Sequence, residues 1–168
     1  TDIDDLIVSA FDLSSFLFQN QNINRARIEG VEAELRFTPA RWASITIAYD
    51  YTKTEDLSTA PVEPLPRRPE NIWRILAEAH PTNRLGLVLK WSWVGERWDF
   101  DFDNAGDPAF SRTFIASYDV GSFAATYDLS EGVQAFARIE NIADQDYEPT
   151  AGYAASPRAG FIGLRYRR

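Results

Sequence analysis

The chain has 168 residues, of which 45% are hydrophobic, 14% aromatic and 25% charged, and its formal net charge is -8. This acidic balance argues against nucleic acid as a partner, because phosphate binding needs a basic surface, and the lack of cysteine excludes disulfides and thiolate metal sites. The mean hydropathy is -0.32, and no apolar run approaches the roughly 18 residues of a transmembrane helix.

The first predicted elements are extended segments. Residues 4–10 are predicted to be the end of a strand that begins upstream. In residues 31–37 and 43–51 apolar side chains alternate with polar ones, with a short break at 39–41 between them. This period of two predicts the two strands of a hairpin. Because the chain begins at Thr1 and contains no methionine, we expect a fragment or a mature chain.

The longest alternation lies in residues 84–98. It places Leu85, Leu87, Leu89, Trp91 and Trp93 on one side of an extended chain. Most strands of soluble proteins have about 5 to 6 residues, whereas a tilted strand that crosses an outer membrane needs about 9 to 11. The stretch therefore favours a membrane-spanning strand.

Four further segments complete a set of eight predicted strands. They are residues 71–79, 113–128, 133–141 and 159–166. The alternation is clear in most of them, but within residues 118–125 it shifts from one face to the other. A β-bulge is predicted there.

The connections between these strands alternate in length. Those at residues 39–41, 81–83 and 130–132 are short, whereas residues 53–66, 99–112 and 144–157 form long segments rich in Asp, Pro, Gly and Ala. Outer-membrane barrels have short turns at one end and long loops at the other. We therefore predict an all-β, antiparallel, up-and-down transmembrane β-barrel.

Two side-chain groups support this fold prediction. Aromatic residues near the strand ends are expected to form girdles at the membrane interfaces, while the alternative, a soluble β-sandwich, would make them core residues. Charged residues within the strands are expected to face the barrel lumen, because a lipid-facing arginine at the midplane costs about 2 to 4 kcal/mol. The aromatic residues are Trp42, Tyr51, Trp93, Trp98 and Tyr166. The charged residues within the strands or at their ends are Glu29, Glu32, Glu34, Arg36, Arg67, Arg68, Arg74, Arg138, Glu140 and Arg158.

The sequence offers little for catalysis or metal binding. His80 is the only histidine and is interpreted as a turn residue beside Pro81, so a metal-hydrolase site or a histidine-centred triad is not expected. The acidic run that starts at Asp99 begins like a calcium loop, but Gly106 comes too late and Phe110 replaces the glutamate at position twelve. A solvated acidic loop with no metal is the favoured interpretation, and loose calcium binding is the alternative.

Six motifs resemble those of TonB-dependent outer-membrane receptors, and they occur in the family's order along the chain. Each motif is weak alone, whereas all six in order are specific. The spacing, with DDLI near the start and a short last loop, looks most like the vitamin B12 receptor branch. The motifs are DIDDLI at 2–7, NRARIEGVE at 24–32, LPRRPEN at 65–71, VGER at 94–97, ENIADQDY at 140–147 and GYAASPRAGFIGLRY at 152–166.

The resemblance implies a part of a larger transporter. Family barrels have about 22 strands around a plug, so residues 1–168 would be about the last eight strands, with the plug domain upstream. The implied function is binding and import of a scarce large ligand, cobalamin or a ferric siderophore, with no catalysis and no cofactor. The implied location is the outer membrane of a Gram-negative bacterium, where the partners are outer-membrane lipid and the TonB-ExbB-ExbD complex that acts on the plug.

Ligand contacts are expected from aromatic residues of the long loops, because rigid rings contribute area to concave sites at a low entropy cost. An equally weighted alternative is that these rings only cap the barrel rim. Two other classes remain: a stand-alone eight-stranded barrel with a structural or adhesion role, which would pair residues 4–10 with 159–166, and a barrel enzyme. The predicted ligand contacts are Trp98, Phe100, Phe102, Tyr147 and Tyr153.

Overall fold

The computed structural model describes residues 1–12, 17–100 and 112–166. In these residues eight strands form one antiparallel sheet, in the order β1-β2-β3-β4-β5-β8-β9-β10, and β6 pairs with β7 in a second, two-stranded sheet. Across the same ranges no helix is long and apolar enough to cross a membrane. The strands are β1 (Asp2–Asp12), β2 (Leu17–Ala40), β3 (Ala43–Asp56), β4 (Asn71–Thr82), β5 (Leu85–Val94), β6 (Arg97–Phe100), β7 (Arg112–Ile115), β8 (Tyr118–Ser130), β9 (Val133–Glu140) and β10 (Ala159–Tyr166).

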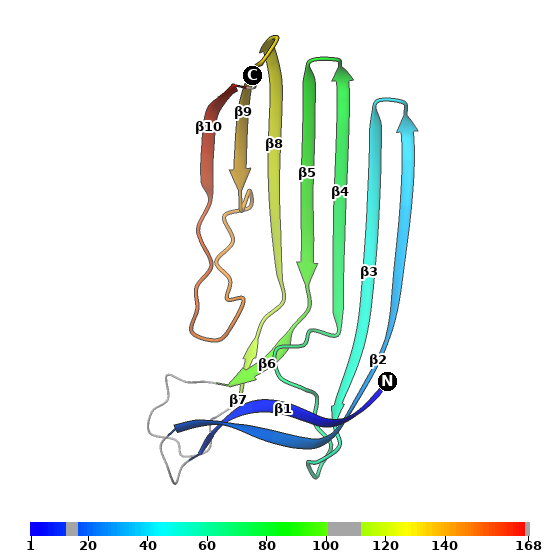
Figure 1. Ribbon diagram of the computed structural model, residues 1–168, viewed down its shortest axis with the longest axis vertical. Helices are drawn as coiled ribbons and strands as arrows, with labels where there is room; N and C mark the ends of the chain where they lie inside the picture. Colours follow the sequence, from blue (N-terminus) through cyan, green and yellow to red (C-terminus); the bar gives the residue numbers. More distant parts are fainter. Residues whose placement is uncertain (13–16, 101–111, 167–168) are drawn as a thin grey trace.

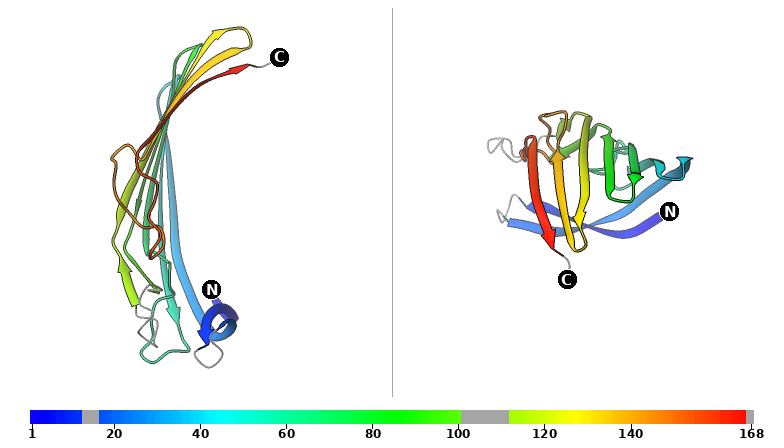
Figure 2. Two further views of the ribbon diagram at one scale, coloured as in Figure 1. Left: turned by 90° about the vertical axis from the view of Figure 1, so that its left-hand side faces the viewer. Right: turned by 90° about the horizontal axis from the view of Figure 1, so that it is seen from above.

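The large sheet is curved and open (Figure 2). Among the described residues β1 pairs only with β2, and β10 pairs only with β9. The closed eight-stranded barrel that was considered as an alternative requires β1 to pair with β10, so the structure contradicts it. The sheet is a segment of a barrel wall, and it confirms the predicted all-β antiparallel fold.

The first strand lies outside the main wall. β1 pairs with residues 17–27 of β2, whereas β3 pairs with residues 26–40 of the same long strand. β1 therefore lies beyond the end of β3, and in Figure 1 the β1-β2 hairpin runs across the lower end of the sheet. The prediction of a strand at residues 4–10 is confirmed, since they lie within β1, whereas its partner segment at residues 17–23 was not predicted.

Strand register assigns the side chains to an apolar and a polar face, since directly paired residues point to the same side of a sheet. Leu35 pairs with Ile47, which pairs with Ile75, and Leu89 pairs with Phe123. This apolar face is not a protein core, because Leu35 is 64% exposed and Ile162 of β10 is 88% exposed. An apolar surface that spans a whole sheet marks an interface with lipid or protein.

The opposite, polar face carries the predicted strand charges. Register places Arg36, Arg74 and Arg138 on this face, with Glu32, Glu34 and Glu140. Arg74 forms an ion pair with Asp50 of β3, and Arg138 Nε lies 3.2 Å from Glu140 Oε1. Glu29 is an exception: it pairs with Lys53 on the other face, beyond the start of β4.

The predicted bulge in residues 118–125 is absent. Pairing between β5 and β8 runs without a shift from Leu85 and Tyr127 to Val94 and Tyr118, which places Val120 on the polar face. The interruption of the apolar pattern comes from Gly121, because the Trp91 ring covers this glycine and an added Cβ would lie 2.3 Å from ring atom Cε3. Trp91 Nε1 also donates a hydrogen bond to Asp119 Oδ1 at 3.0 Å.

Short turns and long connections lie at opposite ends of the sheet, as predicted (Figure 1). His80 lies in β4 near its end, not in the turn, and its backbone N–H donates to the carbonyl of Trp42. The predicted strand at 84–98 divides at residues 95–96 into β5 and β6, so part of the expected long loop is a hairpin. Four of the buried apolar side chains lie at this loop end: Leu65, Trp98, Ile115 and Ala151.

Candidate functional site

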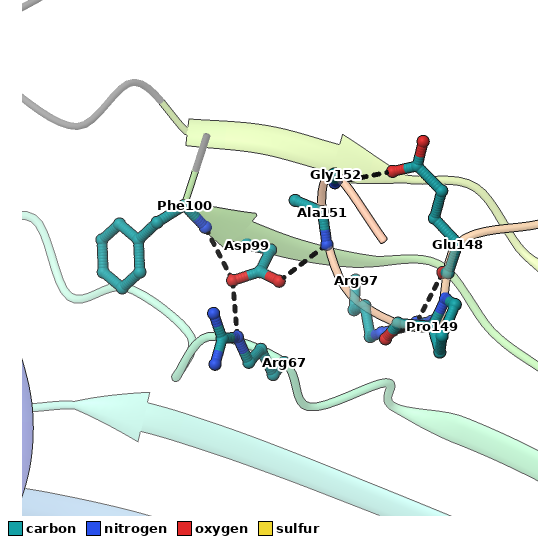
Figure 3. A network of polar contacts seen from close by, with 8 residues as sticks. All are labelled: Arg67, Arg97, Asp99, Phe100, Glu148, Pro149, Ala151 and Gly152. Atoms are coloured by element: carbon teal, nitrogen blue, oxygen red, sulfur yellow. Dashed lines mark hydrogen bonds and ion pairs between the residues drawn. The ribbon is translucent and has the colours of Figure 1, made fainter. Parts of the chain in front are cut away.

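Segments from three connections meet at the loop end of the sheet. We call them the loop cluster, defined as residues 57–70, 97–100, 112–115 and 141–158. Figure 3 shows that Arg67, Asp99 and Ala151, one residue from each connection, converge on one point. The loop cluster therefore holds together residues that lie far apart in the sequence.

Asp99 is the centre of this arrangement and is fully buried. Its Oδ1 accepts hydrogen bonds from Arg67 Nε at 2.7 Å and from the Phe100 backbone N–H at 2.8 Å, and its Oδ2 accepts one from the Ala151 N–H at 3.1 Å. A buried carboxylate is costly unless it is paired and hydrogen-bonded, and these three donors meet that requirement. Arg67 has φ 61 and donates its own N–H to the Trp98 carbonyl, so the backbone conformation there serves this contact.

Arg97 attaches the last long connection to β6. Its Nη2 donates to the carbonyls of Pro149 at 2.6 Å and Glu148 at 3.1 Å, and its guanidinium lies 5.4 Å from the centre of the Tyr118 ring. Nη1 is buried and has no hydrogen-bond partner in the described structure. A buried donor without a partner costs about 1 to 3 kcal/mol, so the packing around Arg97 offsets a real penalty.

Asn141 closes the last long connection on itself. Its Nδ2 donates to the carbonyls of Gln145 and Ser156, at 3.0 and 3.2 Å, and its Oδ1 accepts from the Gln145 N–H. Next to it the rings of Tyr118 and Tyr147 stack with centres 4.2 Å apart. Burial raises the pKa of the Tyr147 hydroxyl above its ordinary value.

The predicted ligand-contact residues that the structure describes all lie in the loop cluster, but they differ in exposure. Trp98 is only 8% exposed, its indole N–H donates to the Pro64 carbonyl at 2.7 Å, and Arg112 covers its ring, so it is a packing residue and not an interfacial girdle residue. Phe100 contacts the Trp98 ring edge-on, Tyr147 is half-buried, and Tyr153 is 68% exposed. Phe102 lies outside the described residues.

The sequence did not reveal two features of the loop cluster. The pairing of Arg67 with Asp99 joins residues 32 apart, and Phe114 is 77% exposed at the loop end. The LPRRPEN motif, which contains Arg67, was the one sequence feature that could have indicated the pairing of Arg67 with Asp99. The acidic residues after Asp99 in the calcium-like run lie outside the described residues, and in the described part no group of three His, Cys, Asp or Glu residues could hold a metal ion.

The sheet has one apolar and one polar face, and its short turns and long loops lie at opposite ends. These features define the wall of a membrane β-barrel. A family model described as "TonB dependent receptor-like, beta-barrel" matches residues 1–142. The chain belongs to this family, as its motifs predicted.

Individual relatives agree with the family. The chain is 27% identical over 171 residues to the vitamin B12 transporter BtuB of Vibrio cholerae serotype O1, a match that covers 99% of this chain and 26% of the relative. Among solved structures it resembles the pyoverdine receptor FpvA of Pseudomonas aeruginosa PAO1, with TM-score 0.75, 16% identity and coverage of 99% of this chain and 26% of that one. The siderophore receptor PirA of Acinetobacter baumannii gives TM-score 0.75 and 18% identity, with 98% and 28% covered. The chain thus spans about a quarter of these relatives.

Proposed function

We propose that residues 1–168 are the C-terminal part of the barrel of a TonB-dependent outer-membrane transporter, which binds and imports a scarce large ligand. The observation that carries this proposal is the family match over residues 1–142. The sheet that these residues help to form is open at both edges. Both edges expose unpaired backbone groups, which lipid does not tolerate. The remaining strands and the plug would come from the rest of the receptor.

The two faces of the sheet would have different roles in the proposed transporter. The apolar face, with Leu35 and Ile162 exposed, would contact outer-membrane lipid. The polar face would line the lumen around the plug, which the TonB-ExbB-ExbD complex would rearrange to release the ligand. No bond of the ligand is made or broken in this mechanism, and the named relatives are transporters and receptors.

Cobalamin and a ferric siderophore are the two proposed ligands. Similarity to a vitamin B12 transporter over 99% of the chain supports the first, and the fold shared with siderophore receptors supports the second. Tyr153 is the strongest ligand-contact candidate, because it is the exposed aromatic residue of the predicted set in the described structure. Phe100 and Tyr147 would support the surface around it.

Uptake by the full-length receptor tests the transport proposal. We would express it in a Gram-negative host without its own cobalamin and siderophore receptors, and measure uptake of labelled cyanocobalamin and of a labelled ferric siderophore with and without TonB. The proposal predicts uptake of one ligand that disappears without TonB. A receptor that inserts in the outer membrane but transports neither ligand, or transports independently of TonB, contradicts it.

The same assay tests the ligand-contact residue. Tyr153→Ala is expected to raise the half-saturating ligand concentration about tenfold, the effect of losing about 1.4 kcal/mol of binding energy. Leu129→Ala is the matched control, since Leu129 is also exposed but lies beside a turn at the opposite end of the sheet. An unchanged concentration dependence in Tyr153→Ala removes Tyr153 from the site without affecting the transport proposal.

A further inference from the structure

The segment that carries Tyr153 closes on itself at the loop end of the sheet. The Ala155 N–H donates to the Tyr147 carbonyl at 2.9 Å, and the Tyr153 N–H donates to the Thr150 carbonyl at 3.0 Å. Gly152 has φ 76, which suits the third position of a type II turn. We call residues 147–155 the tip loop. Its internal hydrogen bonds fix the place of Tyr153 within the loop.

Two side chains of β6 hold the tip loop against the rest of the protein (Figure 3). Arg97 and Asp99 are two residues apart in this strand, so their side chains point to the same side of it. Arg97 Nη2 donates to the carbonyls of Glu148 and Pro149, at 3.1 and 2.6 Å, and Asp99 Oδ2 accepts from the Ala151 N–H at 3.1 Å. We call Arg97 and Asp99 the β6 clamp, which fixes three backbone groups of the tip loop.

The β6 clamp is buried, whereas the ring that follows it is exposed. Asp99 is fully buried and Arg97 is 7% exposed, while Tyr153 is 68% exposed. The clamp side chains therefore offer almost no surface to a large ligand. Ala151 is also buried and lies two residues before Tyr153, so the clamp acts on the exposed ring through the backbone between them.

Two features of this arrangement are unfavourable by themselves. Arg97 Nη1 is buried and has no hydrogen-bond partner in the described structure, which costs free energy. Arg67, whose Nε donates to Asp99 Oδ1, has φ 61, a backbone conformation that residues other than glycine seldom adopt. Such local penalties occur mainly where function requires a fixed geometry. They indicate that the clamp does more than fill space.

We propose that Arg97 and Asp99 are positioning residues for ligand binding, which hold the tip loop so that the Tyr153 ring is in place before the ligand arrives. This role rests on the proposed function, because Tyr153 is the ligand contact named there. A tip loop released from β6 would keep its internal hydrogen bonds but move relative to the sheet. Ordering it again on binding costs entropy, so release should weaken ligand affinity more than it slows transport.

Asp99→Asn is the most selective way to release the tip loop, because it keeps the shape of the side chain. Oδ1 accepts from two donors, Arg67 Nε and the Phe100 N–H, whereas Oδ2 accepts from the Ala151 N–H. In the variant the oxygen should stay with the two donors, which turns the new amide nitrogen toward the Ala151 N–H. Two donors then face each other, and the contact with the tip loop is lost.

A spin label at Tyr153→Cys, in a full-length receptor without other accessible cysteines, measures whether the clamp holds the tip loop. We expect Asp99→Asn to make this label more mobile. Arg97→Lys keeps the charge but loses the shape that reaches two carbonyls, so it should do the same, and it provides the test if Asp99→Asn does not insert in the membrane. The matched control Asp146→Asn, at an exposed position of the same connection, should leave the label as it was. Equal mobility in the clamp variants and the unmodified receptor would overturn the proposal.

Ligand uptake tests whether this positioning serves binding. Asp99→Asn should raise the half-saturating ligand concentration about fivefold and lower the maximal rate less than about twofold. In a receptor that already carries Tyr153→Ala, the same substitution should add less than about twofold, because the residue that it positions is gone. A full fivefold effect in that background would show that Asp99 acts through the structure at large, and would overturn the proposal.

The transport proposal and the clamp proposal fail separately. A receptor that transports neither ligand contradicts the first, while the mobility of the spin label still tests the second. Transport in which Asp99→Asn leaves the half-saturating concentration unchanged refutes only the role of the clamp. Transport in which Tyr153→Ala has no effect also refutes it, since the clamp would then position no ligand contact.

Discussion

The eight-stranded sheet and the loop cluster are stabilised in different ways. In the sheet, continuous backbone pairing fixes the strands, while large apolar side chains such as Leu35 and Ile162 are exposed. In the loop cluster the stabilising contacts are specific, as in the hydrogen bond from the Ala151 N–H to Asp99, which joins residues 52 apart in sequence.

This difference predicts different tolerance to substitution. A wall position requires mainly a side chain that suits its face, because the backbone supplies most of the hydrogen bonds. A loop-cluster position requires one particular group, since a buried donor left without its acceptor costs about 1 to 3 kcal/mol. The variants below test that distinction in the full-length receptor.

The largest effect is expected for Asp99→Ala. The substitution removes the carboxylate that accepts hydrogen bonds from the Ala151 N–H, the Phe100 N–H and Arg67 Nε. The cost should be about 2 to 3 kcal/mol, or roughly 30- to 150-fold faster hydrogen exchange at the Ala151 amide. Asp146→Ala is the control, because Asp146 is exposed and lies in the same connection as Ala151. It should change the exchange of the Ala151 amide less than about threefold. Equal exchange in both variants would show that Asp99 does not hold the cluster together.

Gly121→Val should have the next largest effect and tests a wall position that needs a particular residue. The new Cβ would displace the Trp91 ring, because ring atom Cε3 lies 2.3 Å from the position that the Cβ would occupy. Overpacking of this kind costs about 1 to 3 kcal/mol, measurable as a lower free energy of unfolding in guanidinium. Gly160→Val is the control, because nothing lies within 4 Å of a Cβ added there. Similar losses in both variants would attribute the effect to glycine itself and not to the Trp91 contact.

A smaller effect is expected for Trp91→Phe. The ring remains, but the indole donor to Asp119 Oδ1 is lost, so the unfolding free energy should fall by about 1 kcal/mol. Trp93→Phe on the same strand face removes an indole that makes no hydrogen bond in the described structure. The unfolding free energy should therefore fall by less in Trp93→Phe than in Trp91→Phe. The reverse order would contradict the role assigned to the hydrogen bond.

The smallest effect is expected for the ion pair of Arg74 and Asp50 on the polar face. The Arg74 side chain is about half exposed, so water screens the pair, and a double-mutant cycle with Arg74→Gln and Asp50→Asn should give a coupling below about 1 kcal/mol. A coupling of several kcal/mol would show that the polar face, like the loop cluster, depends on particular partners.

Sequence periodicity predicted the wall strands because successive side chains of a strand point to opposite faces. The position of a residue within its strand is therefore enough to assign its face. The alternation of Leu85, Leu87 and Leu89 sufficed to place β5, and Glu32, Glu34 and Arg36 of β2 lie on the opposite face from its apolar residues. The method failed where the local pattern is silent. It shortened β2, because the sequence of residues 19–25 is mostly polar and shows no alternation, and it predicted a bulge where Gly121 only makes room for Trp91.

The loop cluster could not be predicted in the same way. Trp98 is aromatic and lies in a long connection, which are the properties expected of a ligand contact, yet three partners distant in sequence bury it. Nothing near Asp99 in the sequence indicates that Arg67 and Ala151 approach its carboxylate. Such contacts depend on where the wall places the ends of its strands, which local patterning does not specify.

The central claim is that the apolar face of this sheet lies against lipid in a receptor barrel. Spin labels at Leu87→Cys, Val88→Cys, Leu89→Cys and Lys90→Cys, introduced one at a time on β5 of the full-length receptor in membranes without other accessible cysteines, test it most directly. Collisions with oxygen, which dissolves in lipid, should be high at 87 and 89 and low at 88 and 90. Oxygen accessibility without this alternation, or with the opposite phase, would contradict the account.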